Sequence, residues 1–344
     1  MLSLKTQVLD LSMRDTYNAF VASCSHRIMY HTWKYKDFIK ELLNVEEHYL
    51  CAVNTDGQIQ GVLPMLYKNG PLGAVYNSLP FYGSNGGILT NNKEVFEFLV
   101  KEYNQFVNEN LLCSSTVISN PLKPEDDYSD LTQNYVDYRI GQFSEIHFTE
   151  NHAGQLMNMF HYKTRNMIRK AIKEGVKVEI DNSAIDFLYE THHENMIAIG
   201  GKPKSKKFFD LLNKYYKSEK DYRIYTAHLN GNTISALLLF YTGETVEYYT
   251  PVIVEKYRDK QALSLIIYTA MIDASVNGYK QWNWGGTWTT QQGVYAFKKK
   301  WGTKDIKYYY YTHIKNQNTL NQTKEYLLKY YDNLFVVAFD KLIT

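Results

Sequence analysis

The chain contains two similar stretches, YLCAVNTDGQIQGVLPMLY at residues 49–67 and YRIYTAHLNGNTISALLLFY at residues 222–241. In each stretch, two runs rich in apolar and aromatic residues flank a short polar turn. Asp56-Gly57 and Asn230-Gly231 supply the positive-φ residues that a two-residue hairpin requires. Each stretch therefore predicts a strand, a tight turn and a second strand.

A helical segment precedes each hairpin, at residues 35–43 and again at 206–216. This repeated order indicates a duplication, and a chain of 344 residues is long enough for two domains. We expect an α/β fold (α+β, with mixed sheets) made of two tandem domains, residues 1–148 and 149–316. An amphipathic helix over 317–344 should follow and dock on the body. Membrane binding is the alternative for this helix, but its polar face mixes acidic and basic residues.

Composition narrows the classes of function. The formal net charge of +2 is too small for whole-protein attraction to DNA or to a membrane, so at most a peripheral membrane contact is expected. Cys24, Cys51 and Cys113 are odd in number and widely spaced, which argues against a disulfide framework and favours a reducing compartment. No leader or membrane-spanning pattern is evident, so we expect a cytoplasmic protein.

The second half begins with a basic helix after Asn151. Its apolar residues recur at helical spacing, and Arg165, Arg169 and Lys173 follow one another at i, i+4 and i+8 beside them. A further basic group comprises Lys202, Lys204, Lys206 and Lys207. Each group alone is typical of a solvated helix face. Together with the glycine loop described next, they favour a phosphorylated substrate.

The strongest candidate for chemistry is WNWGGTWTTQQGVYAFKKKWG at residues 282–302. Gly285 and Gly286 end a predicted strand, where α/β sheets commonly bind ligands, and the helix that follows has an N-terminus that favours anions. Of the lysines at 298–300, helical spacing lets only one or two face inward. The alternative is a glycine turn followed by a solvated lysine face.

Other features give weaker signals. His192-His193-Glu194 lacks the i, i+4 histidine pair of a metalloprotease helix, so no metal site is expected. Trp33, Tyr82 and Trp284 are candidate contacts to a sugar or acyl group, although core packing explains each of them as well.

Four motifs carry a resemblance to a known family: LPFYGSNGG at 79–87, KTRNMIRKA at 163–171, GKPKSKKFF at 201–209, and the segment from Trp284 to Gly302. With these motifs the chain resembles the FemABX-like branch of the GNAT acyltransferase superfamily. That branch comprises peptidoglycan-bridge aminoacyltransferases and relatives in cell-envelope polysaccharide biosynthesis. The resemblance implies two GNAT-like domains and an enzyme that transfers an acyl or aminoacyl group to an amine.

The resemblance also implies roles for individual residues. Phe297-Lys298 matches the family's functional Phe-Lys pair, and we expect Lys298 to stabilise a carbonyl oxyanion or a phosphate together with N–H groups of the glycine loop. Tyr249 lies on the strand that faces the acyl donor in GNAT proteins, and we prefer it to Tyr248 as a second catalytic residue. The expected substrate-binding residues are Arg165, Arg169, Phe297, Gly285, Gly286, Trp284, Tyr82 and Trp33.

Two departures from the family leave the donor open. No long coiled-coil arm, as in several members that use aminoacyl-tRNA, is visible in the sequence. RDKQAL at 258–263 occupies the place of the GNAT pyrophosphate loop, with Gln261 and Leu263 at glycine positions. We therefore expect no tightly bound cofactor, and a donor that is either acyl-CoA (or acyl carrier protein) or aminoacyl-tRNA.

The expected acceptor is a phosphorylated or nucleotide-linked amino sugar or peptide, as in peptidoglycan precursors. The alternative to an enzyme is a non-catalytic module that binds a glycan or RNA in the same basic, aromatic cleft. An intact Phe297-Lys298 pair argues against this alternative.

Overall fold

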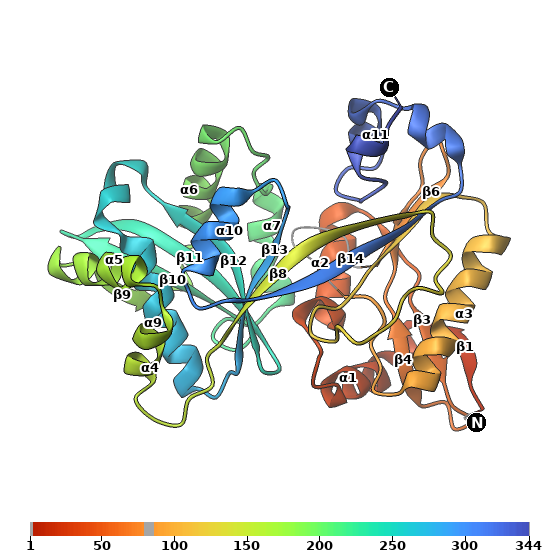
Figure 1. Cartoon of the computed structure of the whole chain (residues 1–344), viewed down its shortest axis with the longest axis horizontal. Coiled ribbons are helices and arrows are strands. Elements are labelled where there is room, and N and C mark those ends of the chain that lie inside the picture. The colour runs from red at the N-terminus through yellow and green to blue at the C-terminus, as the bar shows by residue number, and fades with distance from the viewer. Residues whose placement is uncertain (1–2, 79–85, 344) are drawn as a thin grey trace. The chain divides into compact units, whose positions relative to one another are not determined.

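The computed structural model describes residues 3–78 and 86–343. The chain divides into two compact units, one of residues Met1–Ile140 and Ile306–Thr344 and one of Gly141–Asp305. The limits fall inside two long strands, β8 (Tyr135–Glu145) and β14 (Lys304–Ile314), which pass from one unit to the other (Figure 1). Residues from 306 onward therefore belong to the first unit and not to the second.

The first unit contains two sheets with helices packed on them. Apart from β8 and β14, its elements are β1 (Lys5–Val8), α1 (Arg14–Ser23), α2 (Trp33–Leu43), β2 (Glu46–Glu47), β3 (Leu50–Val53), β4 (Ile59–Leu63), β5 (Leu66–Lys68), β6 (Ala74–Asn77), α3 (Lys93–Glu109), β7 (Leu112–Ile118) and α11 (Lys324–Tyr330). One sheet has the order β1-β3-β4, and the strands β2-β5-β6-β7-β14 are consecutive in the other. Short 3-10 turns at Leu11–Met13, Met29–His31, Gln317–Asn321 and Phe339–Lys341 complete the unit.

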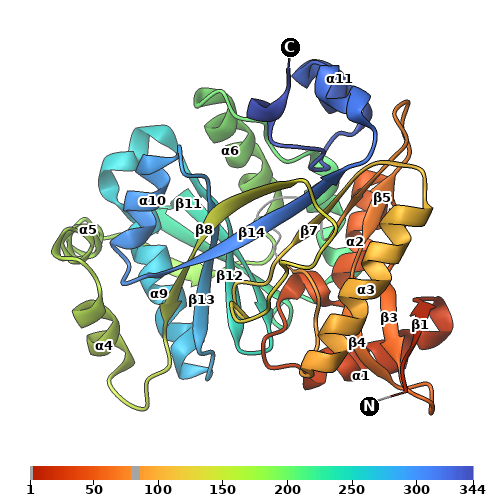
Figure 2. The same cartoon turned by 45° about the vertical axis from the view of Figure 1, so that its right-hand side comes forward.

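The helix α3 shows why the first unit folds locally as it does. Asn92 precedes it, and its side chain accepts hydrogen bonds from the N–H groups of Glu94 and Val95, which caps the helix start. Apolar residues at a spacing of three and four then form one buried face. This face packs on β3 and β4 (Figure 2).

Apart from its part of β8, the second unit consists of a five-stranded sheet with helices on both faces. Its elements are α4 (His152–Met159), α5 (Tyr162–Lys173), β9 (Lys177–Ile180), α6 (Ile185–Ala198), α7 (Lys206–Asp210), α8 (Leu212–Tyr215), β10 (Tyr222–Leu229), β11 (Asn232–Thr242), β12 (Thr245–Ile253), α9 (Ala262–Val276), β13 (Gln281–Thr287) and α10 (Gln292–Lys299), with a 3-10 turn at Glu255–Lys260. The strand order is β13-β12-β11-β10-β9.

Only the β12–β13 pair among these five strands is parallel; the other three pairs are antiparallel. The connection between β12 and β13 is α9, an almost wholly apolar helix that packs with α4 and α5 against one face of the sheet. The helix α6 packs on β11 and β12. This mixed arrangement of strands and helices confirms the predicted α/β fold class.

The two hairpins that predicted the fold are both present, but they differ. β10 and β11 join through Asn230 and Gly231, both at positive φ, as a two-residue turn requires. β3 and β4 join through a longer turn, in which the N–H of Asn54 donates to the carbonyl of Gln58 at 3.0 Å. The prediction of a two-residue turn is therefore wrong for the first hairpin.

Two predicted helices are shorter than their apolar spacing suggests. The basic helix after Asn151 is split into α4 and α5, because Phe160 takes an extended conformation and the His161 side chain caps α5 by accepting from the N–H of Lys163. In the tail over 317–344, α11 ends at Tyr330, because Tyr331 leaves the helical conformation with φ −124° and ψ 39°, and Asn333 then adopts a positive φ of 66°.

The tail packs on the first unit. The hydroxyl of Tyr331 donates to the carbonyl of Gly73 at 2.9 Å and accepts from the N–H of Leu72 at 3.0 Å. Leu327 and Val337 are buried in the same cluster. None of the described helices has the length and apolar character needed to cross a membrane.

Candidate functional site

The strands β12 and β13 pair over a short stretch only. Their parallel register joins Thr245–Glu247 to Gln281–Asn283. Beyond this point β12 continues to Ile253 and β13 to Thr287. A β-bulge in β12 opposite Leu238 and Leu239, and a φ of +73° at Gly285, change the course of the two strands there. The carboxyl ends of these two parallel strands are therefore not paired with each other. Ligands commonly bind at such a place in α/β folds.

Lys298 lies at the end of β13 and is buried there. It projects from α10 and is 6% exposed. Its ammonium donates to the hydroxyl oxygen of Thr287 at 2.9 Å and lies 3.4 Å from the carbonyl oxygen of Gly285 and 3.3 Å from that of Gly286. All three acceptors are neutral. Because burial disfavours the charged ammonium, it lowers the pKa of Lys298 to about 8.

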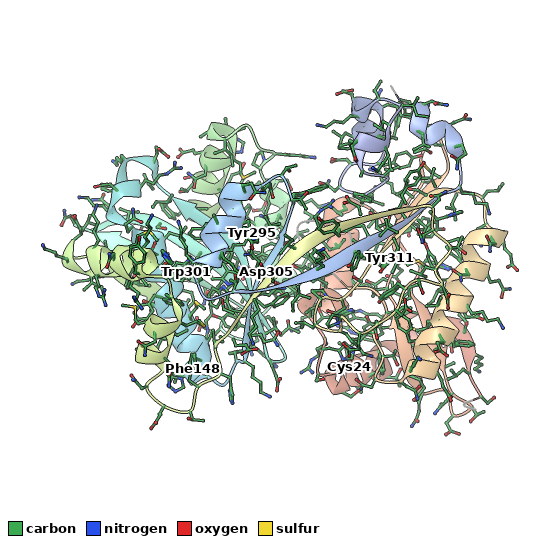
Figure 3. The ribbon with its side chains drawn as sticks, in the orientation of Figure 1. Cys24, Phe148, Tyr295, Trp301, Asp305 and Tyr311 are labelled. Carbon is green, nitrogen blue, oxygen red and sulfur yellow. The ribbon has the colours of Figure 1, made fainter. Side chains whose placement is uncertain are left out.

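The neighbouring lysines lie in different surroundings. The ammonium of Lys299 is paired with the carboxylate of Asp305 at 3.0 Å, and that carboxylate also accepts from the Tyr295 hydroxyl at 2.6 Å (Figure 3). Lys300 directly follows α10 as its C-cap, and its carbonyl accepts from the N–H of His161 at 2.9 Å. Of the three lysines, Lys298 alone is buried, so the structure agrees with the helical-spacing argument that few of them face inward.

The end of β13 is also connected to a buried acid that was not predicted from the sequence. The connection runs through one hydrogen-bonded side chain. Glu247 on β12 is 2% exposed, and the side-chain amide of Asn283 donates to both its carboxyl oxygens at 2.8 and 3.0 Å. Burial raises the pKa of Glu247 to about 8, although the hydrogen bonds from Asn283 oppose this. The other end of the Asn283 amide accepts from the N–H of Gly285 at 2.8 Å.

This network changes the expected role of the glycine loop. The N–H of Gly285 is occupied by Asn283, so it is not free to stabilise an oxyanion. The carbonyl groups of Gly285 and Gly286 instead approach the Lys298 ammonium. The two glycine carbonyl groups therefore help to hold the ammonium, and Lys298 is a buried donor at the end of β13.

A second hydrogen-bond path reaches Lys298 from β8. The Thr287 hydroxyl donates to the amide oxygen of Gln142 at 3.4 Å, and the amide nitrogen of Gln142 lies 3.3 Å from the hydroxyl of Thr303. Gln142 and Thr287 are both buried. Because its own hydrogen is directed to Gln142, the Thr287 oxygen presents lone pairs to the ammonium.

Tyr248 and Tyr249 point to opposite faces of β12. Tyr248 packs on Trp284 at a ring distance of 4.9 Å, within the aromatic core. Tyr249 stacks on Phe208 at 5.6 Å with nearly parallel rings. The expected alternation is therefore present, and the catalytic role of Tyr249 stays a prediction.

The Tyr249 ring belongs to a second buried basic group. The Lys204 ammonium lies 5.2 Å from the centre of this ring, and burial lowers the pKa of Lys204 to about 7. The backbone N–H of Lys204 donates to Nε2 of His192 at 3.1 Å. Lys206, in contrast, is exposed and paired with Asp210, so the basic run at 202–207 is not one uniform surface.

The two arginines predicted to bind the acceptor lie on α5. Arg165 is half-buried, with one guanidinium nitrogen 3.4 Å from the carbonyl of Met157, and Arg169 is exposed, 3.4 Å from the Asn166 side chain. Among the described residues, neither arginine shares a hydrogen-bond partner with Lys298. Their first helical turn does meet α10, because the Thr164 hydroxyl donates to the Lys300 carbonyl at 3.2 Å.

The predicted aromatic contacts are mostly accounted for by packing. Trp284 is 2% exposed, and its indole N–H donates to the Ser144 hydroxyl at 2.9 Å. Phe297 is partly buried against the same core. Trp33 is buried in the first unit and donates to a carboxyl oxygen of Asp37 at 2.9 Å. Tyr82 lies outside the residues that the structure describes.

The start of α9 retains the backbone of a glycine turn without the glycine. Gln261 precedes the helix with a φ of 60°, and its carbonyl accepts from the N–H of Ser264 at 3.0 Å. This left-handed conformation is the one that glycine adopts readily and that a larger side chain adopts at a cost. At Gln261 the chain therefore departs from the family pattern in its side chain, whereas the backbone keeps the conformation of a glycine turn.

Similarity to known proteins agrees with this geometry. Residues 160–299, which include Lys298, match the family model described as "Acetyltransferase (GNAT) domain". No curated protein sequence matches the chain. This match confirms the GNAT part of the resemblance inferred from the motifs that lie within residues 160–299.

Three solved structures share the fold at low sequence identity. FemX has a TM-score of 0.70 and 16% identity, covering 92% of this chain and 98% of FemX. A conserved protein of unknown function from Bacteroides thetaiotaomicron has a TM-score of 0.59 and 12% identity. The match covers 92% of this chain and 100% of that protein. The C-terminal domain of a putative lysylphosphatidylglycerol synthetase from Agrobacterium fabrum has a TM-score of 0.54 and 12% identity. The match covers 86% of this chain and 92% of that domain.

Proposed function

We propose that this chain, an acyltransferase with a GNAT domain at residues 160–299, transfers an acyl or aminoacyl group to the amine of a cell-envelope precursor. The acceptor would be an amino sugar or a peptidoglycan-precursor-like peptide, carried on a phosphate or a nucleotide. The observation that carries the proposal is the buried Lys298 ammonium at the end of β13, whose partners among the described residues are all neutral oxygens.

The chemistry needs little more than positioning and one cationic donor. A neutral amine attacks the carbonyl carbon of an activated ester or thioester, and the carbonyl oxygen gains negative charge. An N–H of the Lys298 ammonium would donate to this oxyanion. Two of its present contacts are 3.3 and 3.4 Å long, so an anion would displace weak hydrogen bonds. Collapse of the intermediate breaks the bond between the carbonyl carbon and the leaving oxygen or sulfur, and the proton that the former amine nitrogen loses balances the one that the leaving alcohol or thiol takes up.

Glu247 and Asn283 would act as positioning residues in this scheme. Asn283 bridges the Glu247 carboxyl group and the N–H of Gly285. It thereby fixes the turn whose carbonyl contacts Lys298. A site whose donor is held in place before the reaction loses less free energy to reorganisation in the transition state.

The donor is the least constrained part of the proposal. Acyl-CoA, acyl carrier protein and aminoacyl-tRNA would all present an activated carbonyl to the same site. The Gln261 side chain at the start of α9 disfavours close approach of a pyrophosphate, because a glycine would leave that space open. The name of the lysylphosphatidylglycerol synthetase relative denotes lysyl transfer, which supports an aminoacyl donor here.

The test is product formation. An amino-sugar nucleotide or a peptidoglycan-precursor peptide is incubated with the protein and either acyl-CoA or charged tRNA, and the acceptor is weighed by mass spectrometry. Transfer adds the mass of the acyl group minus a proton, and the Lys298→Ala variant should give little product. Salt-dependent binding of RNA or glycan without any heavier acceptor would instead support the non-catalytic binding module.

A further inference from the structure

The outward side of α5 carries a high concentration of positive charge. The helix has the sequence YKTRNMIRKAIK over Tyr162–Lys173 and contains no acidic residue. Its cations are Lys163, Arg165, Arg169, Lys170 and Lys173. All of them are exposed except Arg165, which is half-buried. The second unit therefore presents a surface of one sign, in a chain whose formal net charge is only +2.

The packing of α5 fixes which side chains face solvent. Thr164, Ile168 and Ala171 are buried at a spacing of three and four residues, on the side of the helix that packs against α9 (Figure 1). Residues three and four apart are neighbours on a helix surface, so the remaining side chains form two adjacent rows. The first row is Tyr162, Arg165, Arg169 and Ile172, and the second row is Lys163, Asn166, Lys170 and Lys173.

The cations of these two rows are not neutralised within the described part of the chain. None of them forms an ion pair with a described residue. The guanidinium groups of Arg165 and Arg169 each have one contact, to a neutral oxygen at 3.4 Å. Glu174 directly follows the helix, but its carboxylate is paired with the Lys260 ammonium at 2.9 Å. The positive charge is therefore available to an external anion.

A helix of the first unit shows what a face that meets only water looks like in this chain. The helix α3 mixes two lysines with four glutamates. Its exposed Lys93 lies 3.5 Å from Glu97, one turn farther along the helix. Charges of both signs keep such a surface solvated without attracting a particular partner. The face of α5, with cations alone, is instead typical of a surface that meets a polyanion.

Exposed apolar side chains in the first row favour a lipid bilayer over a nucleic acid. Tyr162 is 54% and Ile172 is 56% exposed, and they lie at the two ends of the row that contains Arg165 and Arg169. In a helix that lies on a membrane, aromatic and aliphatic side chains enter the headgroup layer while neighbouring cations contact lipid phosphates. An exposed isoleucine has no comparable partner on a phosphodiester backbone.

We propose that the two exposed rows of α5 dock on the surface of a bilayer that contains anionic phospholipids. The arginine and lysine side chains bind lipid phosphates, and Tyr162 and Ile172 enter the headgroup layer. From Lys163 to Lys173 the cations extend over about 15 Å, at a rise of about 1.5 Å per residue, so several headgroups bind together. This docking goes beyond the transfer reaction and does not depend on Lys298.

The test is flotation of the whole chain with two kinds of vesicle, in about 0.1 M salt. One kind is phosphatidylcholine alone, and the other contains about 30% phosphatidylglycerol. We expect at least about tenfold tighter binding to the anionic vesicles, and loss of that difference in about 1 M salt, where charges are screened. Equal binding to both vesicles in low salt would overturn the proposal. Binding to an RNA duplex without binding to either vesicle would also overturn it, in favour of RNA.

Two triple variants locate the charge contact. The first replaces three exposed lysines of α5: Lys163→Gln, Lys170→Gln and Lys173→Gln. The matched control replaces three exposed lysines elsewhere: Lys5→Gln, Lys101→Gln and Lys220→Gln. Both variants lower the net charge equally, and glutamine keeps the helix propensity of lysine. Binding to the anionic vesicles should weaken at least about tenfold in the first variant and less than about twofold in the control. Equal losses in the two variants would overturn docking through α5.

A further variant tests the apolar contact. Tyr162→Ser keeps every charge of the helix at an exposed position, and it should weaken binding to the anionic vesicles severalfold. Binding as tight as that of the wild type would overturn the insertion of this row into the headgroup layer. The Lys298→Ala variant should bind the vesicles as the wild type does, which separates a failure here from a failure of the proposed reaction.

Discussion

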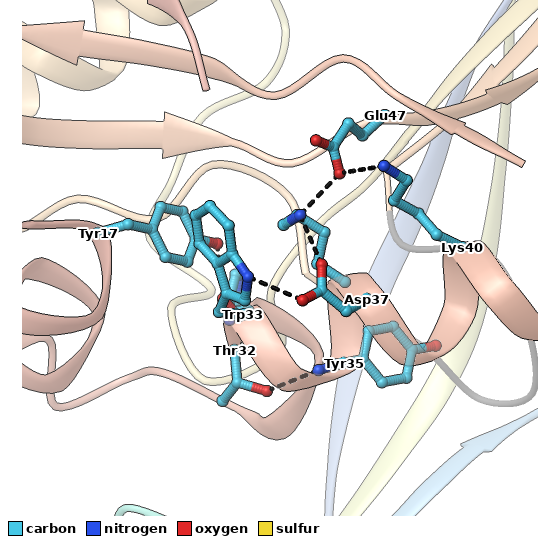
Figure 4. Close-up of polar contacts among 9 residues, drawn as sticks. Tyr17, Thr32, Trp33, Tyr35, Asp37, Lys40 and Glu47 are labelled. Carbon is cyan, nitrogen blue, oxygen red and sulfur yellow. Dashed lines mark hydrogen bonds and ion pairs between the residues drawn. The ribbon is translucent and has the colours of Figure 1, made fainter. Parts of the chain in front are cut away.

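The two units each contain a lysine that is almost wholly buried, and the two are held in opposite ways. In the first unit, the Lys36 ammonium lies 2.8 Å from a carboxyl oxygen of Asp37, 2.7 Å from one of Glu47, and 4.1 Å from the centre of the Trp33 ring (Figure 4). In the second unit, the partners of the Lys298 ammonium within residues 3–78 and 86–343 are a hydroxyl and two carbonyl groups.

The difference separates a structural lysine from a chemical one. At Lys36 two carboxylates compensate the buried charge, and Lys40 at 3.0 Å shares one of them. At Lys298 no carboxylate in the described part of the chain compensates the charge, so burial lowers its pKa, and its hydrogen bonds can be exchanged for those of an anion. A buried cation without an anion is costly to keep, which is a reason to look for its use at that position.

The largest expected effect is that of Lys298→Ala on turnover. If the ammonium stabilises the oxyanion, its removal should lower kcat by roughly 100-fold to 1,000-fold, as loss of such a donor does in other enzymes. The matched control is Lys299→Ala, one residue away on the same helix, whose ammonium is paired with Asp305 outside the core. Equal kcat in wild type and Lys298→Ala at saturating substrate would place Lys298 with Lys36, as a structural residue.

The second prediction concerns stability in the first unit. Lys36→Met leaves Asp37 and Glu47 without their shared cation, so the free energy of unfolding in urea should fall by about 2 kcal/mol. This is below the loss for a fully buried pair, because the two carboxylate side chains are 36% and 23% exposed. The control Lys93→Met removes an exposed i, i+4 pair with Glu97 and should change stability by less than about 0.5 kcal/mol. If kcat of Lys36→Met fell under conditions in which the variant is still folded, Lys36 would have a chemical role.

The third prediction is a pH dependence that follows from the lowered pKa of Lys298. The ammonium is charged below a pKa of about 8 and neutral above it. The rate at saturating substrate should therefore fall as pH rises through 8, by up to about tenfold per pH unit. Lys298→Arg keeps its charge throughout this range, so its lower rate should show no such fall. A wild-type rate that keeps rising to pH 10 would contradict a role for the charged lysine.

Part of this comparison could be predicted from the sequence. Helical spacing indicated that only one or two of the lysines at 298–300 face inward, and the Phe297-Lys298 match selected the one that is buried. The burial of Lys204 could not be predicted, because GKPKSKKFF at 201–209 reads as one basic run with no periodicity long enough to separate an inward lysine from outward ones.

Glu247 and Asn283 show a second limit of the sequence. They are 36 residues apart and meet because β12 and β13 pair in a particular parallel register, across the crossover helix α9. A single sequence fixes neither this register nor the partner of a buried acid. The available signal was a glutamate inside an otherwise apolar and aromatic strand, which burial makes exceptional.

The smallest expected effect is that of Thr287→Val, which removes the nearest acceptor of the Lys298 ammonium and keeps the shape of the side chain. A hydrogen bond to the charged form stabilises that form, so its loss should lower the pKa of Lys298 further. The pH at which the rate falls should move down by about half a unit, and the rate at pH 8 should fall about twofold. Thr287→Ser keeps the hydroxyl and should restore the wild-type profile, whereas Thr289→Val, at an exposed position two residues on, should leave it unchanged. If Thr287→Val moved the profile no more than Thr289→Val does, the hydroxyl would have no part in tuning Lys298, and the two carbonyl groups would hold the ammonium alone.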